Sequence, residues 1–141
     1  MSEAQIKDKK IHLKIITHEQ VVYENDVDAI YSPGSKGEFG VLYNHIPFMT
    51  TLQIGVTKVV IDGKSEYIST LGGIFQVKDN HALILADEAE KGSDIDVPRA
   101  KLAKERAEAR LGNAKDKKER ARAERAIARA MARLKAADIK L

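Results

Sequence analysis

The sequence contains no cysteine and no tryptophan. Without cysteine there is no disulfide, no thiolate nucleophile and no zinc site built on sulfur, which fits a reducing compartment. No stretch approaches the ~18 apolar residues of a membrane-spanning helix, and the polar start MSEAQIKDKK has no apolar signal-peptide region. These absences predict a soluble, non-secreted protein that does not insert directly into a membrane.

Catalytic and metal-binding motifs are also absent from the sequence. The triplet Gly63-Lys64-Ser65 ends like a P-loop, but that motif needs a glycine five residues before Gly63, where Lys58 stands. A hairpin turn at Asp62-Gly63 explains it better. The histidines show no metal-ligand spacing and no nearby nucleophile motif: His12, His18, His45 and His81. We therefore expect no catalytic residue and no metal site, and a protein that is not an enzyme.

Aromatic residues and charge divide the chain near residue 93. Every Phe and Tyr lies at or before Phe75. Residues 1–93 carry nine Lys/Arg and thirteen Asp/Glu, a net charge of −4, whereas residues 94–141 carry fifteen and eight, a net charge of +7. We predict two domains, 1–93 with an apolar core and 94–141 as a basic appendage.

The first part has the pattern of an all-β domain. Short apolar, β-branched runs are separated by turn signals such as Asp62-Gly63 and Asp79-Asn80, and the pair Gly72-Gly73 indicates a bend or bulge. Many short strands at about ten-residue spacing are typical of an antiparallel sandwich or barrel. Residues 87–94 are predicted to be a polar link. The expected strands lie near residues 11–16, 21–23, 27–31, 39–42, 51–54, 56–61, 66–70, 74–78 and 81–86.

The second part predicts a two-helix hairpin. Asp94 or Asp96 offers an N-cap oxygen, and Pro98 suits a first helical turn. A helix of roughly 15 residues then reaches a turn at Gly112-Asn113, and a second helix is expected from about residue 116 to residue 137. The fold class is therefore α+β, a β-sandwich followed by an antiparallel helical hairpin.

Arginines recur at helical spacing on both predicted helices and form one stripe on each: Arg99, Arg106 and Arg110, then Arg122, Arg125, Arg129 and Arg133. Like charges three or four residues apart cost about 0.2–0.5 kcal/mol per pair, so these stripes favour an anionic partner. A plain solvated face is the alternative. The opposite faces are mostly alanine, which predicts a well-formed hairpin that is weakly attached to the sandwich.

Three stretches resemble the epsilon subunit family of bacterial F-type ATP synthases: GEFGVLYNHIPFM at 37–49, LGGIFQVKDNHALILADEAE at 71–90 and IDVPRAKLAKERAEARL at 95–111. The resemblance implies a ten-stranded β-sandwich that binds the gamma subunit and the membrane rotor ring, followed by a two-helix regulatory domain. It implies a non-catalytic central-stalk subunit that couples rotation to ATP synthesis. It also implies a peripheral location on the cytoplasmic face of the bacterial plasma membrane.

The same resemblance implies that the hairpin inhibits ATP hydrolysis. When extended, its basic side chains would meet an acidic segment of the beta subunits through Arg106, Arg110, Arg122, Arg125, Arg129 and Arg133. When folded down, it would bind ATP as a regulatory ligand, with or without Mg²⁺, through Glu90, Ile95, Asp96, Arg99, Arg106, Arg129 and Arg133. Asp96 is equally explained as a helix N-cap.

One alternative function starts from the same basic hairpin. A nucleic-acid-binding protein would use the arginine stripes against phosphates and would show steep salt dependence. The hairpin has no aromatic residue on which bases could stack, which disfavours this alternative.

Overall fold

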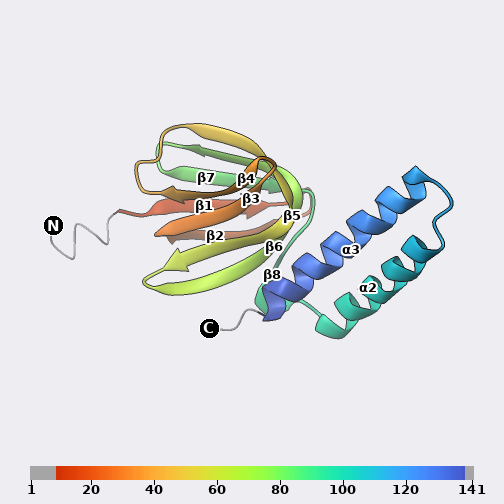
Figure 1. Ribbon diagram of the computed structural model, residues 1–141. Coiled ribbons are helices and arrows are strands. Elements are labelled where there is room, and N and C mark those ends of the chain that lie inside the picture. Colours follow the sequence, from red (N-terminus) through yellow and green to blue (C-terminus); the bar gives the residue numbers. More distant parts are fainter. Residues whose placement is uncertain (1–8, 139–141) are drawn as a thin grey trace.

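The structure is a computed structural model that describes residues 9–138, and it contains a β-domain followed by two helices (Figure 1). Residues 1–8, most of the polar start of the chain, lie outside the described residues. No helix in residues 9–138 combines the length and the apolar character needed to cross a membrane. The elements are β1 (Ile11–Ile16), β2 (Val21–Val27), β3 (Ala29–Gly34), β4 (Gly37–Leu42), β5 (Phe48–Ile61), β6 (Lys64–Lys78), β7 (His81–Ala86), β8 (Ala89–Lys91), the 3-10 helix η1 (Gly92–Asp94), α2 (Val97–Gly112) and α3 (Lys117–Asp138).

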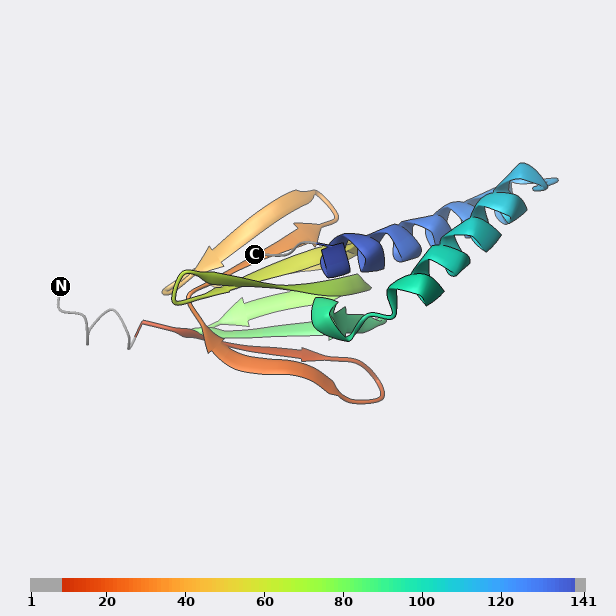
Figure 2. The same cartoon turned by 90° about the horizontal axis from the view of Figure 1, so that it is seen from below.

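The strands form one hydrogen-bonded path in the order β2-β1-β7-β6-β5-β3-β4, and β8 pairs with β6 outside this path. The β1–β7 pair is parallel, and the other pairs in this path are antiparallel. The sheet curls, so that β1 and β2 lie on one side of the domain and β3 and β4 on the other (Figure 2). This arrangement confirms the predicted β-sandwich.

Two tight turns form where the sequence predicts them. Asp62 and Gly63, with φ of 49° and 80°, connect β5 to β6, and Asp79 and Asn80, with φ of 50° and 61°, connect β6 to β7. Positive φ at both central residues is the requirement of a type I′ hairpin, whose twist matches that of the strands. The hairpin explanation of Asp62-Gly63 is therefore confirmed.

The strand β6 bends at Gly72-Gly73 without ending. Both glycines have positive φ, 81° and 131°, and a Cβ on Gly73 would collide with the Leu85 carbonyl. Before the bend β6 pairs with β8, and from Gly73 onward it pairs with β7. Two predicted strands thus form a single one here, as they do in β5, which reduces the nine strands expected from the sequence to seven. With β8, the described residues contain eight strands, where the family resemblance implied ten. β8 also corrects the prediction that residues 87–94 are only a polar link.

The core lies inside the curled sheet. Alternate residues of β1 point inward, as period-2 burial predicts. The Phe75 ring is fully buried and meets the Phe39 ring edge-on, with 4.8 Å between centroids. Buried hydroxyl groups satisfy one another, since Thr57 bonds both Ser32 and Thr70 at 2.8 and 2.9 Å. The largest fully buried side chains are Phe75, Ile11, Leu13, Ile15, Ile30, Ile68, Ile84, Val27, Val41, Val59 and Val77.

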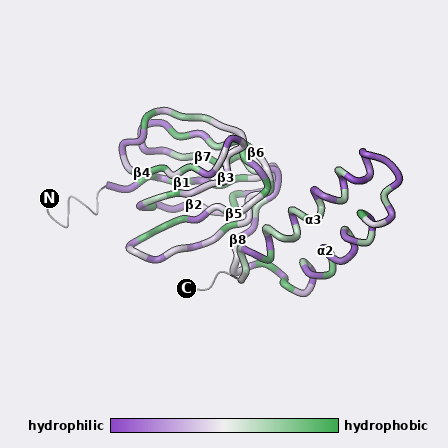
Figure 3. Tube along the Cα trace, in the orientation of Figure 1, coloured by the Kyte–Doolittle hydropathy of each residue, from purple (hydrophilic) through white to green (hydrophobic). Residues whose placement is uncertain are grey.

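The helices pack on each other through alanines and reach the sandwich through α3. Ala100 and Ala107 of α2 are buried, as are Ala123 and Ala130 of α3. The end of α3 lies against β5, β6 and η1, where the Gly92 backbone approaches the Ala136 carbonyl closely. The far end of the hairpin projects away from the sandwich and is strongly hydrophilic (Figures 1 and 3). The predicted hairpin and its alanine-rich interface are both present.

Candidate anion site at the junction of the two domains

A cavity of about 490 Å³ lies where β8, the link and both helices meet. Its volume is in the range of small-molecule sites. The lining residues are Glu90, Ile95, Asp96, Arg99, Ala100, Leu102, Ala103, Arg106 and Arg133. Six of the seven residues expected to bind ATP therefore line one cavity, although Glu90 of β8 and Arg133 of α3 are more than 40 residues apart in the sequence.

The start of α2 positions one wall of this cavity. Asp96 is the N-cap, and its Oδ1 accepts a hydrogen bond from the Arg99 backbone N–H at 3.1 Å. Asp94 instead ends η1, so the capping residue is Asp96. Because side chains three and four residues apart share a helix face, Arg99 and Arg106 project on the same side as Ala103 between them. The cap gives Asp96 a structural role beside the cavity and explains an acid at this place.

Arg133 supplies the opposite wall, and it already has acidic partners. Its Nη2 lies 2.8 Å from Glu88 Oε2, and its Nε lies 3.6 Å from Glu90 Oε1. The expectation of arginine stripes without partners is therefore wrong at Arg133, because the sandwich brings two carboxylates to it. Among the described residues, no other arginine of the hairpin takes part in an ion pair.

Arg129 is the predicted ATP residue that does not line this cavity. It lines a second, larger groove of about 880 Å³ between the distal halves of the helices. Arg129 lies on the same face of α3 as Arg133 but one helical turn nearer the hairpin turn, beyond the reach of Arg133's partners. Four arginines expected to bind the beta subunits line this distal groove, which consists of Ala109, Arg110, Asn113, Glu119, Arg122, Ala123, Arg125, Ala126 and Arg129.

The chemistry of the junction cavity suits a phosphorylated ligand. Guanidinium groups bind phosphate through pairs of parallel hydrogen bonds, and Arg99, Arg106 and Arg133 surround the space. Ile95 and Leu102 add apolar surface to the same cavity. Residues 9–138 contain no group of three or more His, Cys, Asp or Glu side chains that could hold a metal ion. The cavity can therefore bind an anion, and nothing in its wall resembles a catalytic nucleophile with its base.

The turn between β4 and β5 lies at the end of the sandwich away from the hairpin (Figure 1), and large apolar residues in and beside this turn are exposed. Ile46 and Met49 are 74% and 67% exposed. Contiguous exposed apolar residues commonly mark a protein–protein contact. The sequence analysis did not single out this apolar surface, although apolar residues on both sides of Pro47 in a loop would have been a usable signal. It comprises Leu42, Tyr43, Ile46, Phe48 and Met49.

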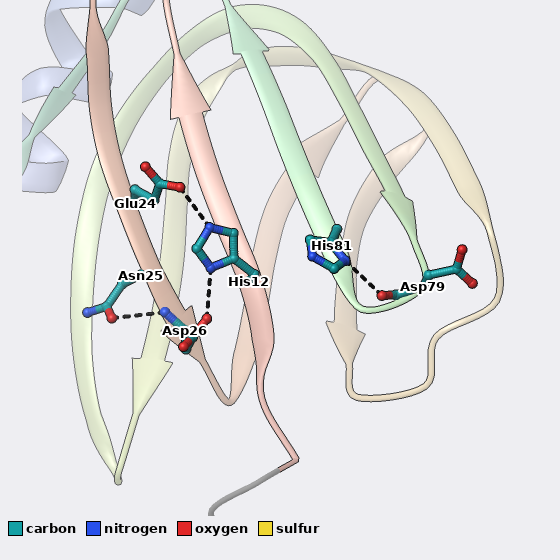
Figure 4. Close-up of polar contacts among 6 residues, drawn as sticks. All are labelled: His12, Glu24, Asn25, Asp26, Asp79 and His81. Carbon is teal, nitrogen blue, oxygen red and sulfur yellow. Dashed lines mark hydrogen bonds and ion pairs between the residues drawn. The ribbon is translucent and has the colours of Figure 1, made fainter.

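A charged cluster surrounds His12 on the outer face of β1 (Figure 4). Its Nδ1 lies 2.8 Å from Asp26 Oδ1, and its Nε2 lies 2.7 Å from Glu24 Oε2. Both ring nitrogens must donate to these carboxylates, and the hydrogen bonds to Asp26 and then to Glu24 raise the pKa of His12 above 6.5. The sequence pattern predicts a strand residue here, and the pairing of β1 with β2 adds the two acids.

The fold and the cavity together define a β-sandwich protein with a basic helical hairpin and an arginine-lined cavity between its two parts. Residues 10–92 match the family description "ATP synthase, Delta/Epsilon chain, beta-sandwich domain", and residues 93–138 match "ATP synthase, Delta/Epsilon chain, long alpha-helix domain". The chain therefore belongs to the ATP synthase delta/epsilon family, and it is an accessory subunit of a rotary complex and not a catalytic one.

Similar proteins support this assignment along almost the whole chain. The ATP synthase epsilon chain of Nitratidesulfovibrio vulgaris is 44% identical over 128 residues, which cover 91% of this chain and 96% of that one. The epsilon chain of Syntrophobacter fumaroxidans is 45% identical over 130 residues, which cover 92% and 97%. These matches give no support to the nucleic-acid-binding alternative.

Solved structures agree with the fold. A chain in the Euglena gracilis mitochondrial ATP synthase, in a structure of OSCP, F1 and the c-ring, has a TM-score of 0.77 and 27% identity, covering 92% of this chain and 81% of that one. A chain from the central stalk and c-ring of the Tetrahymena thermophila mitochondrial ATP synthase has a TM-score of 0.60 at 14% identity, covering 89% and 95%. The second likeness concerns the fold alone.

Proposed function

We propose that this chain works in the central stalk of an F-type ATP synthase, where the sandwich couples rotation to ATP synthesis and the hairpin restrains ATP hydrolysis according to the ATP concentration. The observation that carries the regulatory part is the junction cavity. Six residues expected for ATP line it, and they come from β8, the link, α2 and α3. A ligand in this place contacts both domains and so favours the folded-down hairpin.

The folded-down hairpin is attached in a way that permits release. Its buried contacts are mostly alanine methyl groups, each of which contributes far less than a large aliphatic side chain. ATP, with or without Mg²⁺, would be bound by Arg99, Arg106 and Arg133, with Glu90, Ile95 and Asp96 around them. Arg129 would join the site only if its side chain moved out of the distal groove. Loss of ATP would then shift the population toward an extended hairpin.

In the extended position the arginines would meet an acidic segment of the beta subunits. The residues proposed for this contact lie in both cavities, with Arg106 and Arg133 at the junction and Arg110, Arg122, Arg125 and Arg129 in the distal groove. Arg106 and Arg133, together with Arg129, are therefore predicted for both contacts. Binding of ATP and binding of the beta subunits would compete for the same guanidinium groups.

The sandwich supplies the other proposed contacts. The exposed apolar surface around Ile46 and Met49 lies away from the hairpin, so both ends of the molecule can be engaged at once (Figure 1). We assign the gamma subunit and the membrane rotor ring as the partners of the sandwich. The protein would then lie at the cytoplasmic face of the bacterial plasma membrane, held there through the complex.

Calorimetry with ATP tests the nucleotide site on the full chain. We expect Arg99→Ala and Arg106→Ala each to weaken ATP binding about tenfold or more, because each removes a charge-assisted contact to phosphate. Arg120→Ala is the matched control, since Arg120 is an exposed arginine of α3 that lines neither cavity. Wild-type protein that binds no ATP would reject the nucleotide site.

The ATPase activity of the assembled complex tests the brake. We expect a complex that carries the chain truncated after residue 94 to hydrolyse ATP faster than the wild-type complex when ATP is scarce. The difference should narrow at high ATP concentration, where the wild-type hairpin is folded down. Equal hydrolysis at every ATP concentration would reject the brake and leave the structural role of the sandwich.

A further inference from the structure

The carboxylate of Glu88 makes the shortest ion pair between the sandwich and the hairpin in the described residues, 2.8 Å to Arg133. Glu88 lies between β7 and β8, outside the set of residues predicted for the ATP site. Its backbone is held in place, because its carbonyl accepts a hydrogen bond from Leu71 N–H at 2.9 Å, and the neighbouring Asp87 N–H donates to the Gly72 carbonyl at 3.2 Å. The bend of β6 thus presents Glu88 to α3.

Arg133 occupies the wall between two cavities. It lines the junction cavity and also a neighbouring cavity of about 310 Å³, in which Glu88 and Glu90 are both lining residues. The Arg133 side chain is 27% exposed, and that of Glu88 is 57% exposed. With Nη2 directed to Glu88 and Nε to Glu90, the guanidinium keeps further N–H groups for a ligand in the junction cavity.

We propose that Glu88 is a positioning residue for the anion site, which acts through Arg133 and holds the hairpin down when no nucleotide is bound. This inference deepens the proposed function and rests on it for the nucleotide. Without Glu88, Arg133 keeps only the longer contact to Glu90, and the end of α3 is then held mainly by its packing against β5, β6 and η1. Glu88 therefore prepares the cavity before ATP arrives.

The size of the effect follows from the exposure of the pair. Partly exposed ion pairs contribute little, so we expect Glu88→Gln to lower the ratio of docked to undocked hairpin by about two- to fivefold without nucleotide. The effect should fade in about 1 M salt, where the Debye length is about 3 Å. A change in packing would not respond to salt in this way.

Fluorescence energy transfer on the full chain measures this ratio. The sequence has no cysteine, so Lys64→Cys at the start of β6 and Lys118→Cys at the start of α3 give two unique labelling sites. Glu88→Gln is compared with Glu124→Gln, which removes an exposed acid of α3 that has no ion pair among the described residues. We expect only Glu88→Gln to lower the docked fraction.

The charge-swapped double variant Glu88→Arg plus Arg133→Glu separates positioning from ligand binding. It should restore part of the docking without nucleotide, because the pair between positions 88 and 133 is re-formed with opposite polarity while Glu90 repels the carboxylate at position 133. ATP binding by calorimetry should stay weak because the phosphate-binding cation has moved. Unchanged docking in Glu88→Gln would overturn the role of Glu88, as would a docked fraction in the double variant no higher than in Arg133→Glu alone. A wild-type protein that does not bind ATP would instead reject the nucleotide site and leave the docking result intact.

Discussion

The sandwich and the hairpin are stabilised by different kinds of contact. The sandwich buries whole aromatic and aliphatic side chains such as Phe75 and Ile84, each of which contributes about 1.5–3 kcal/mol. The hairpin buries alanines such as Ala107 and Ala130, and a methyl group contributes about 0.8 kcal/mol. One part of the molecule is therefore a rigid base, and the other is regular as helix yet held to that base by a few small contacts.

The sandwich and the hairpin also differ in net charge, and this difference too indicates a hairpin that is weakly attached to the sandwich. The hairpin has a large excess of cations, and most of its arginines line two open cavities in place of forming ion pairs. In the proposed function each domain does what the other cannot, because the sandwich would keep its shape while bound to its partners and the hairpin would change position when an anion binds. The weak attachment of the hairpin to the sandwich is therefore a property of the amino-acid composition of the hairpin as well as of the contact surface.

The largest expected effect is a loss of stability of the sandwich. Phe75→Ala should lower the free energy of unfolding by about 3–5 kcal/mol, because it empties the fully buried space beside Phe39. Urea unfolding followed by circular dichroism measures the change. Ala130→Gly in α3, where the residue is 0% exposed, should cost only about 2 kcal/mol, about 1 from helix propensity and about 0.8 from the lost buried methyl group. Comparable losses in the two variants would contradict the distinction between the two domains.

The next effect concerns the junction. Gly92→Ala should weaken docking of the hairpin by about 1–3 kcal/mol, because the new Cβ would collide with the Ala136 carbonyl and approach the Tyr67 carbonyl oxygen to 3.0 Å. Amide hydrogen exchange of the last turns of α3 measures this loss. Gly112→Ala is the matched control, since nothing lies within 4 Å of its Cβ. Equal exchange in the two variants would show that Gly92 does not set the approach of α3.

A smaller effect is expected from a substitution in the exposed apolar surface of the sandwich, which should weaken assembly without changing stability. Ile46→Asp should leave the free energy of unfolding within about 0.5 kcal/mol, because the side chain is 74% exposed, yet weaken assembly with the other rotor subunits about tenfold. Co-purification at graded concentrations measures the assembly. Val21→Asp alters an exposed apolar residue of β2 outside this apolar surface and serves as the control. If both variants assemble normally, the apolar surface is not the contact.

The smallest effect is the pH dependence of the His12 cluster. Because the pKa of His12 is raised in the folded protein, the stabilisation by Asp26 and Glu24 is fully present below the ordinary value of 6.5 and is lost as pH rises through the folded value. The His12 side chain is 39% exposed, so solvent screening keeps this term at about 1 kcal/mol or less.

Urea unfolding of wild type and His12→Gln between about pH 5.5 and about pH 8.5 measures the contribution of His12. The difference in stability between the two proteins should shrink toward the alkaline end. A difference that grows with pH would show that His12 is not held as the charged form. The nearby Lys14 on the same strand and His81 on β7 remain in both proteins, so they do not enter the comparison.

Local patterns predicted the elements well, and their failures have clear causes. Two-residue turn chemistry located the β5–β6 and β6–β7 connections, because positive φ at Asp62-Gly63 and Asp79-Asn80 is a local requirement. A glycine pair in the middle of an apolar run looks locally like an interruption. The three-dimensional structure shows that β6 continues through Gly72-Gly73, where its pairing partner changes from β8 to β7. β8 forms because its backbone pairs with the first half of β6.

At the candidate site, too, some residues could be predicted from local sequence patterns and others depend on contacts between distant parts of the chain. Helical spacing put Arg99 and Arg106 on one face, and the family resemblance added Glu90, Ile95 and Arg133. The resemblance also included Arg129, which lines the distal groove in this structure. Glu88 was missed altogether, because a glutamate in a polar link carries no local signal, and its partner Arg133 is 45 residues further along the chain.

The sequence by itself determined that this protein has an apolar β-domain and a basic helical hairpin, because turn chemistry, strand alternation and helical spacing depend on neighbouring residues. The tertiary structure alone decided which arginines face each cavity and which one meets two carboxylates. Those relations depend on where the bend of β6 and the last turns of α3 come together in space, and residues far apart in the chain share no local pattern that encodes the distance between them.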